Sequence, residues 1–214
     1  MTFLLFTQIL AVAAAVFCMT AFIIRLRVFL RLAVPKDRSQ PKGDPKAGAV
    51  YALSMGMMPW AKESTRRHAL AYLRGVGFHL AIFLVLVLFL VSPWLGSIPG
   101  TLRIVLAVLC GFGSMLALLG FFSRFIEASL KALSTPDDYF AILLVSLFLA
   151  SSAVMLLNVA LLPLFYLVAA LTFVYMPLGK IRHCIYFVFS RLFFGRFFGR
   201  RAVLPHSQQQ DMSV

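Results

Sequence analysis

The stretch GVGFHLAIFLVLVLFLVSPWL, residues 75–95, decides the fold of this chain. It contains no acidic residue, no lysine and no arginine, and a helix needs about 20 mostly apolar residues to cross a bilayer. Four more apolar runs of comparable length cover residues 3–24, 102–123, 139–158 and 160–179. The sequence therefore predicts an all-α membrane protein, in which five transmembrane helices form one bundle domain over residues 1–201.

The composition of the chain also indicates a lipid environment. Of its 214 residues 62% are hydrophobic, and the mean hydropathy is +0.95. A water-soluble domain of this composition would expose too much apolar surface to water. The first apolar run has no basic segment before it and no small-residue cleavage site after it, so we interpret it as a retained helix rather than a signal peptide.

The distribution of positive charge predicts the orientation. The formal net charge is +13, and of the 20 lysines and arginines only Arg103 falls on the side of the membrane opposite to the others. Because basic loops stay in the cytoplasm, the N-terminus is expected outside and the C-terminus inside a multi-pass protein of the cytoplasmic (inner) membrane. Topology and anionic lipid account for the basic surplus, so no nucleic-acid partner is expected.

Two regions are expected outside the hydrocarbon core. The cytoplasmic segment 33–67 begins with a loop at Pro35–Pro45, and its second half, Tyr51–Arg67, favours an interfacial helix over a plain surface linker. The repeated Phe-Phe-Gly-Arg of residues 193–200 is expected on the inner surface, where it would hold lipid headgroups or a partner subunit. The polar tail 202–214 is predicted to be disordered.

Histidines are the candidate ligands. His79 and His183 lie in apolar stretches, and an intramembrane ionisable residue is a functional candidate by default. Two neutral imidazoles from different helices are what the iron of a haem b needs. His68 is the second choice for the first ligand, and His206 is expected to be solvated in the tail. The alternative is that both imidazoles are structural and hydrogen-bonded.

Other polar residues support or limit this reading. Arg74, Lys180 and Arg182 flank the helices of both histidines and are candidates to pair with haem propionates, although positive-inside flanking explains them equally well. Residues 134–138 are typical of a capped helix start, which we favour over a proton relay. The cysteines form no iron–sulfur motif and are interpreted as packing residues: Cys18, Cys110 and Cys184.

Three short motifs occur in a specific order: Phe78-His79-Leu80-Ala81-Ile82, then Thr135-x-x-Asp138, then Pro177 with Lys180 and His183. In these motifs and in its predicted topology, most of the chain resembles the gamma subunit (membrane cytochrome b) family of respiratory nitrate reductases. That family includes the membrane subunit of sulfite-reduction-associated electron-transfer complexes. The resemblance implies that His79 and His183 bind a haem near the cytoplasmic side.

The chain departs from that family at two positions. Nitrate reductase members carry a second, outer haem, and the residues that stand at its ligand positions here are Phe89 and Phe165. The resemblance therefore implies a single haem b, and it does not extend to the outer quinol site that the family builds beside the missing group.

The resemblance also implies a function. We expect electron transfer between the quinone or menaquinone pool and a cytoplasmic iron–sulfur subunit of an anaerobic-type respiratory complex, docked on residues 36–67 and on the chain from Lys180 onward. The substrate chemistry would reside on partner subunits, so that this chain is an electron-transfer subunit of an oxidoreductase. The alternative is a haem-free anchor or assembly subunit that tethers a cytoplasmic partner.

Overall fold

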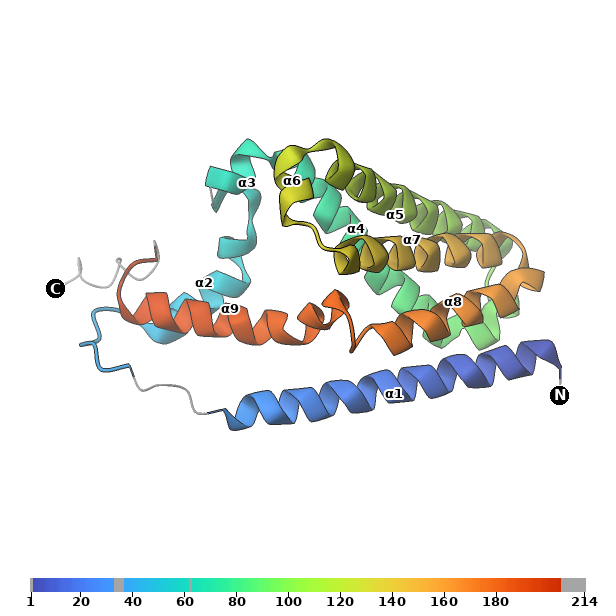
Figure 1. The fold of residues 1–214 in the computed structure, drawn as a ribbon, viewed down its shortest axis with the longest axis horizontal. Helices are drawn as coiled ribbons and strands as arrows, with labels where there is room; N and C mark the ends of the chain where they lie inside the picture. Colours follow the sequence, from blue (N-terminus) through green and yellow to red (C-terminus); the bar gives the residue numbers. More distant parts are fainter. Residues whose placement is uncertain (1, 33–36, 62, 205–214) are drawn as a thin grey trace. The chain divides into compact units, whose positions relative to one another are not determined.

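The computed structural model describes residues 2–32, 37–61 and 63–204, and every regular element in these ranges is a helix. Figure 1 shows the order of the elements. The four longest helices are α1 (Phe3–Arg31), α4 (Ala69–Val91), α5 (Gly100–Ile126) and α7 (Pro136–Leu157). The shorter α-helices are α2 (Pro45–Leu53), α3 (Glu63–Arg67), α6 (Ala128–Leu133), α8 (Leu162–Tyr175) and α9 (His183–Arg200), and the 3₁₀ turns are η1 (Met55–Met57), η2 (Pro59–Ala61), η3 (Ser92–Ser97), η4 (Val159–Leu161) and η5 (Lys180–Arg182).

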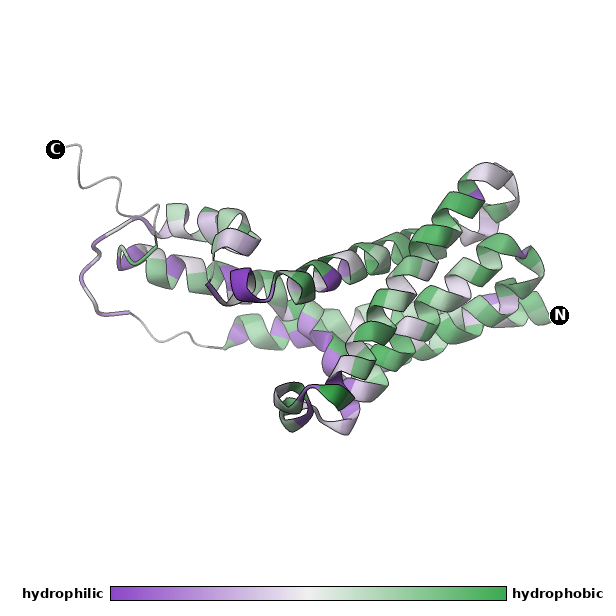
Figure 2. Cartoon of the chain, turned by 90° about the horizontal axis from the view of Figure 1, so that it is seen from above, coloured by the Kyte–Doolittle hydropathy of each residue, from purple (hydrophilic) through white to green (hydrophobic). Residues whose placement is uncertain are grey.

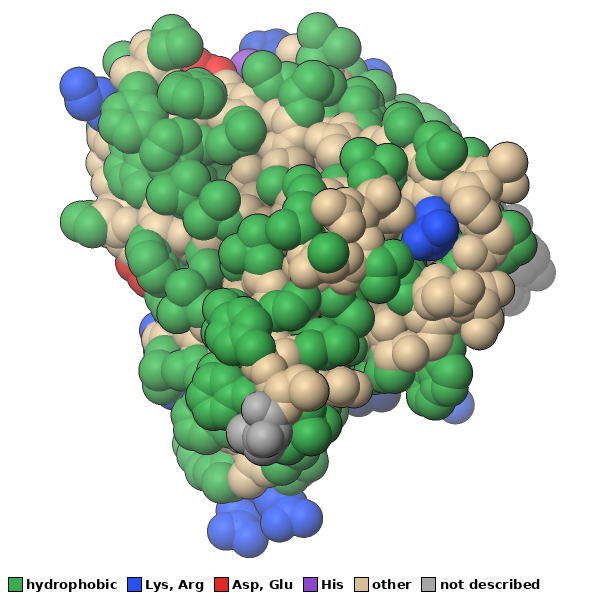
Figure 3. All heavy atoms as spheres, turned by 90° about the vertical axis from the view of Figure 1, so that its right-hand side faces the viewer, with side chains coloured by type: hydrophobic (Ala, Val, Ile, Leu, Met, Phe, Trp, Pro, Cys, Tyr) green, Lys and Arg blue, Asp and Glu red, His purple; other side chains and the backbone are tan. Residues whose placement is uncertain are grey.

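The predicted fold class is confirmed. Four helices of the described chain are long and apolar enough to cross a membrane, and a fifth span results if the interrupted pair Val159–Tyr175 and Lys180–Arg200 is counted as one. Hydrophobic residues run along most of the length of the long helices (Figure 2), and many hydrophobic side chains are exposed on the face shown in Figure 3. The orientation of the N- and C-termini stays a prediction.

The chain divides into two compact units. Unit 1 comprises Met1–Ile23 and Leu73–Ile181, and unit 2 comprises Ile24–Tyr72 and Arg182–Val214. The boundary at residue 201 of the expected bundle domain stays a prediction. Each unit is described separately below.

Close packing of small residues holds the helices of unit 1 together. A Cβ atom on Gly113 of α5 would lie only 2.2 Å from the Cβ of Ala81 on α4, so no larger residue fits at that crossing. On another side of α5, the Ser114 hydroxyl donates to the carbonyl of Ser146 on α7 at 3.0 Å. Small residues let helix backbones approach closely in lipid, where interhelical hydrogen bonds add to the packing energy.

The start of α7 follows the sequence expectation. Thr135 and Asp138 form a capping box in which Asp138 Oδ2 accepts from the Thr135 backbone N–H at 2.8 Å, and Pro136 occupies the first turn. Proline fits there because the first turn has no intrahelical use for its missing N–H. The interpretation of residues 134–138 as a capped helix start is confirmed.

In unit 2, α2 packs against α9 through glycine. A Cβ on Gly195 would lie 2.4 Å from the Gly48 carbonyl oxygen, and a Cβ on Gly199 would lie 2.8 Å from the Gly48 Cα. Gly195 and Gly199 form a G-x-x-x-G pair, and Gly48 and Ala52 are spaced in the same way on α2. The glycines of the Phe-Phe-Gly-Arg repeat are therefore a helix-packing surface, which is the role of small-xxx-small spacing.

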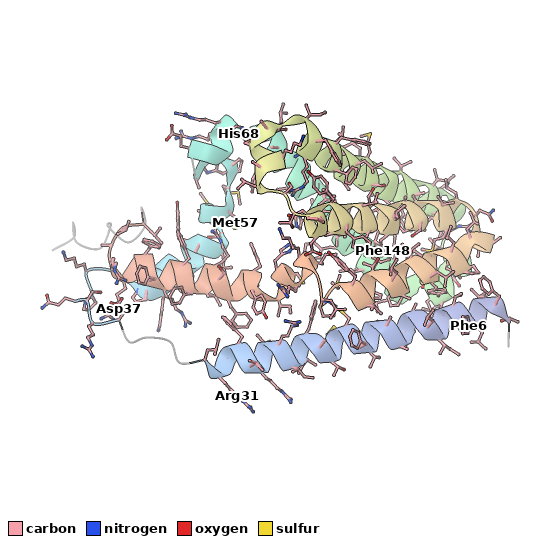
Figure 4. All side chains as sticks on the ribbon, in the orientation of Figure 1. Phe6, Arg31, Asp37, Met57, His68 and Phe148 are labelled. Atoms are coloured by element: carbon pink, nitrogen blue, oxygen red, sulfur yellow. The ribbon has the colours of Figure 1, made fainter. Side chains whose placement is uncertain are left out.

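Arginines of α9 fasten this contact. Arg191 donates from Nε to the Ala52 carbonyl at 3.2 Å and from Nη2 to the Gly56 carbonyl at 3.1 Å, which satisfies acceptors left open where α2 ends. Directly after α9, Arg201 contacts Asp37: Nη2 donates to Oδ1 at 3.1 Å, and Nη1 lies 2.8 Å from Oδ2. Asp37 is labelled in Figure 4. The contact to Oδ1 is a charge-assisted hydrogen bond, and the contact to Oδ2 is an ion pair.

The segment 51–67 differs from the sequence expectation of one interfacial helix. It is divided among the end of α2, η1, η2 and α3. Gly56 and Pro59 interrupt it, because glycine lacks a helix preference and proline cannot donate a hydrogen bond within a helix. The expected loop at Pro35–Pro45 is confirmed for its described part, residues 37–44. Most of the polar tail, residues 205–214, lies outside the described residues.

Replacing Gly195 with valine is expected to separate α2 from α9, since the added carbons meet the α2 backbone. The cost should reach about 1–3 kcal/mol, the usual range for overpacking. Thermal unfolding of the detergent-purified protein measures it. Gly111→Ala on α5 is the matched control, because a Cβ there meets nothing within 4 Å. An unchanged unfolding temperature for Gly195→Val would contradict the packing described here.

Acid is expected to loosen the end of α9. Hydrogen bonds from Ser39, its backbone N–H first, and the Arg201 guanidinium lower the pKa of Asp37. A lowered folded-state pKa means that this stabilisation is present above the ordinary carboxyl range of about pH 4 and is lost as the pH falls below it. Exchange of the Lys42 and Gly43 amide hydrogens, which bond to the Arg200 carbonyl, should accelerate in acid beyond its intrinsic pH dependence. Asp37→Asn should abolish that pH effect.

Candidate functional site

The geometry of His79 resembles that of a metal-binding histidine. His79 lies on α4 in unit 1, its side chain is exposed, and its Nδ1 is 2.7 Å from the carbonyl oxygen of Gly75. A carbonyl only accepts hydrogen bonds, so Nδ1 is the donor, and Nε2 is the ring nitrogen that this bond leaves for a ligand. Metal-binding histidines usually have this arrangement, in which a backbone carbonyl fixes the tautomer and raises the basicity of the second nitrogen.

Space is available on the helix turn that precedes His79. A Cβ built on Gly75 meets no atom within 4 Å. On the other side, the ring of Phe78 meets the imidazole edge-on, with 5.3 Å between their centroids. At Gly75, therefore, no side chain would obstruct a ligand that approaches this part of α4. The sequence reasoning singled out His79 but missed Gly75, whose signal is a glycine four residues before a histidine on a helix.

The other histidines lie in unit 2 or outside the described residues. His183 is the exposed first residue of α9, directly after η5. His68 is exposed between α3 and α4, and its carbonyl accepts from the Tyr72 N–H at 3.0 Å (Figure 4). His206 lies outside the described residues. Because His79 belongs to unit 1 and His183 to unit 2, their pairing stays a prediction.

Two of the three candidate propionate-binding cations have protein partners. Arg74 Nη1 donates to the Ser123 hydroxyl at 2.8 Å and so joins α4 to α5. Lys180 forms an ion pair with Asp138, whose side chain is 14% exposed. Arg182 is exposed immediately before α9. Arg74 keeps further guanidinium donors for a carboxylate ligand, whereas a ligand at Lys180 would compete with Asp138.

The ion pair of Lys180 belongs to a joint between α7 and the end of α8. The Tyr175 hydroxyl donates to the carboxylate of Asp137, and the Tyr175 ring packs edge-on against Phe140 with 4.8 Å between centroids. Gly179 passes so close to that ring that a Cβ would lie 2.1 Å from it. Both acids at the start of α7 therefore hold the chain where α8 ends, a function that the sequence reasoning missed because its partners lie about 40 residues away.

The positions of the absent outer-haem ligands meet in one aromatic cluster. The rings of Phe89 on α4 and Phe165 on α8 are 6.3 Å apart, and Phe165 is fully buried. Phe148 stacks on Phe165 at 5.6 Å, and Phe173 contacts Phe89 at 4.8 Å. Tyr166 completes the cluster, with its hydroxyl 2.9 Å from the Ser92 hydroxyl. Phenyl rings thus occupy the space between these two positions.

The remaining candidate metal ligands are dispersed. Within the described ranges, no group of three or more histidine, cysteine or acidic side chains is arranged to hold a metal ion. A haem iron takes only two axial ligands from a protein, so a haem site does not need such a group. Cys18 and Cys110 are buried, as expected for packing residues, and the Sγ of Cys18 lies 3.7 Å from the sulfur of Met176. Cys184 is exposed.

In comparisons with known proteins, no family model matches the sequence, no curated protein matches it and no solved structure matches the fold. The resemblance to the gamma subunits of nitrate reductases therefore rests on the three short motifs and stays a hypothesis.

Removing the Phe165 ring is expected to destabilise unit 1. Phe165→Ala leaves a cavity among three aromatic neighbours, and large-to-small changes of this kind cost on the order of 3 kcal/mol. Leu164→Ala is the matched control on the same helix, because that side chain is 48% exposed. A chemical-denaturant or thermal titration in detergent compares the two. Equal stability of both variants would show that the cluster does not support the fold.

Proposed function

We propose that this chain is the haem b membrane subunit of an anaerobic-type respiratory complex in the cytoplasmic membrane. It would transfer electrons between quinone or menaquinone and a cytoplasmic iron–sulfur subunit. The observation that carries the proposal is the hydrogen bond from His79 Nδ1 to the Gly75 carbonyl, which leaves Nε2 as a ligand atom on an exposed part of a membrane helix. The apolar α4 and the four-to-five-span architecture supply the lipid setting that the proposal requires.

In this function the protein would bind the haem and keep water away from it. His79 and His183 would hold the haem, and when bound the group supplies reversible one-electron chemistry. The Gly75 carbonyl keeps the His79 ring in the ligating tautomer, and the open side of Gly75 leaves room for an apolar plane. Arg74 and Arg182 have donors available for propionates.

The aromatic cluster supports a single haem. A second group would need ligands at Phe89 and Phe165, and neither phenyl ring has a donor atom. Phe148 and Phe173 fill the surrounding volume. Electrons would therefore enter and leave through the one haem that His79 and His183 would hold. The iron–sulfur chemistry would belong to a partner, since the three cysteines form no cluster motif.

A haem-free anchor is the second candidate, and a specific observation favours it. Arg74 and Lys180, which the haem hypothesis assigns to propionates, already bind Ser123 and Asp138 without any ligand. In that case the histidines would be structural, and the basic cytoplasmic parts would tether a partner.

Haem content distinguishes the two candidates. We expect one haem b per chain in the purified protein, measured by a reduced-minus-oxidised spectrum and by quantitation of the extracted haem. His79→Ala and His183→Ala should each abolish the spectrum, because each removes one of two axial ligands.

His68→Ala is the matched control and should retain the haem, since His68 lies between two helices rather than within a span. Retention of haem in either of the other two variants would overturn the ligand pair. A colourless, well-folded protein from haem-supplied cells would exclude the electron-transfer function and leave the anchor.

A further inference from the structure

The cytoplasmic segment contains a short helix with two contrasting faces. Helix α2 has nine residues and is far too short to cross a bilayer. Its small residues Gly48, Ala49 and Ala52 are buried against α9. Val50 and Leu53 remain 68% and 41% exposed. Packing against α9 thus uses the glycine face of α2 and leaves an apolar face uncovered.

The apolar surface continues into the two turns that follow. Met55 and Met58 are exposed, and Trp60 in η2 is 60% exposed. Together with α2 these turns form what we call the α2–η2 arm, residues 45–61. Tryptophan favours the boundary between headgroups and acyl chains, because its ring is apolar and its N–H remains hydrogen-bonded there.

The arm is tied to the start of a membrane helix. The Tyr72 hydroxyl donates to the carbonyl of Met57, and Tyr72 lies in the first turn of α4. Both contacting residues belong to unit 2. The arm is therefore held beside the point where α4 begins, within reach of the bilayer surface that α4 enters.

Basic residues lie before, within and after the arm in the sequence. Lys42, Lys46 and Arg66 are exposed. The acids described in unit 2 are used locally, since Asp37 binds Arg201, Asp44 caps α2, and Glu63 pairs with Arg67. The exposed field is thus basic, and an anionic surface complements it.

We propose that the α2–η2 arm is an anionic-phospholipid site, in which Val50, Leu53 and Trp60 insert at the headgroup boundary while Lys42 and Lys46 bind the phosphates. A basic rim around an apolar face is the pattern of helices that lie in the membrane interface. The attachment to α4 favours lipid over a protein partner as the occupant. The inference does not depend on haem binding.

Trp60 reports the depth of the arm directly. The chain has two tryptophans, so Trp94→Phe leaves Trp60 as the single emitter. The full chain with this change is placed in nanodiscs of phosphatidylcholine, or of equal parts phosphatidylcholine and phosphatidylglycerol, with and without bromines on the upper acyl carbons. We expect brominated lipid to quench Trp60, and more strongly in the discs that contain phosphatidylglycerol.

Two further variants sharpen the test. Trp60→Phe leaves Trp94, in the turn between two spans, as the positive control for interfacial quenching. Lys42→Gln with Lys46→Gln should shift the equilibrium between lipid-inserted and water-exposed Trp60 toward water by about fivefold for each lysine replaced, in phosphatidylglycerol discs only.

Two outcomes would overturn the proposal. One is water-like Trp60 emission that brominated lipid does not quench while Trp94 is quenched, which would assign the arm to a protein partner. The other is quenching of Trp60 that is indifferent to phosphatidylglycerol and to the two lysines, because the site would then not select anionic lipid.

Discussion

Contact between helix backbones across small residues is the constraint on which this structure depends. In lipid, apolar side chains gain little by leaving their solvent, so helix pairs are held by close packing and interhelical hydrogen bonds. A Cβ added to Gly113 would collide with Ala81 in unit 1, and one added to Gly195 would collide with Gly48 in unit 2. The serine hydrogen bond between α5 and α7 and the arginine contacts of α9 are directional, so they also fix how the packed helices are aligned. Larger residues at these points would push the packed helices apart.

Much of the fold could be predicted because one physical requirement dominates it. Backbone groups in lipid need internal hydrogen bonds, so a long apolar run must form a helix, and residues 75–95 do so within α4 and η3. The capping box at Thr135 was equally readable, since its chemistry is local. What the sequence did not reveal is long-range: the ion pair of Lys180 with Asp138 and the packing of α2 on α9 depend on which segments meet. The spacing of Gly195 and Gly199 can be read from the sequence, but only the structure shows that the two glycines pack against α2.

The candidate site, like the fold, could be predicted from the sequence only in part. That His79 is a possible ligand follows from its residue type and apolar surroundings, whereas its tautomer follows from the Gly75 carbonyl one turn earlier. The flanking cations illustrate the opposite case. Charge placement alone made Arg74 and Lys180 equal candidates for a ligand, yet each has a protein partner of its own. The role of a cation near a helix end can be assigned only when its nearest hydrogen-bond acceptor is known. The number of charges in a sequence does not identify that acceptor.

The aromatic cluster has an energetic consequence if the proposed function holds. A chain of cofactors that spans a bilayer moves charge through the membrane potential, which is worth about 2.3 kcal/mol per elementary charge for every 100 mV. Phe89 and Phe165, packed ring to ring with Phe148 and Phe173, fill that part of unit 1 with side chains that cannot ligate a haem iron. Electron flow would then stay on one side of the bilayer and generate no voltage by itself. Any contribution of this chain to energy conservation would have to come from where quinone takes up or releases protons.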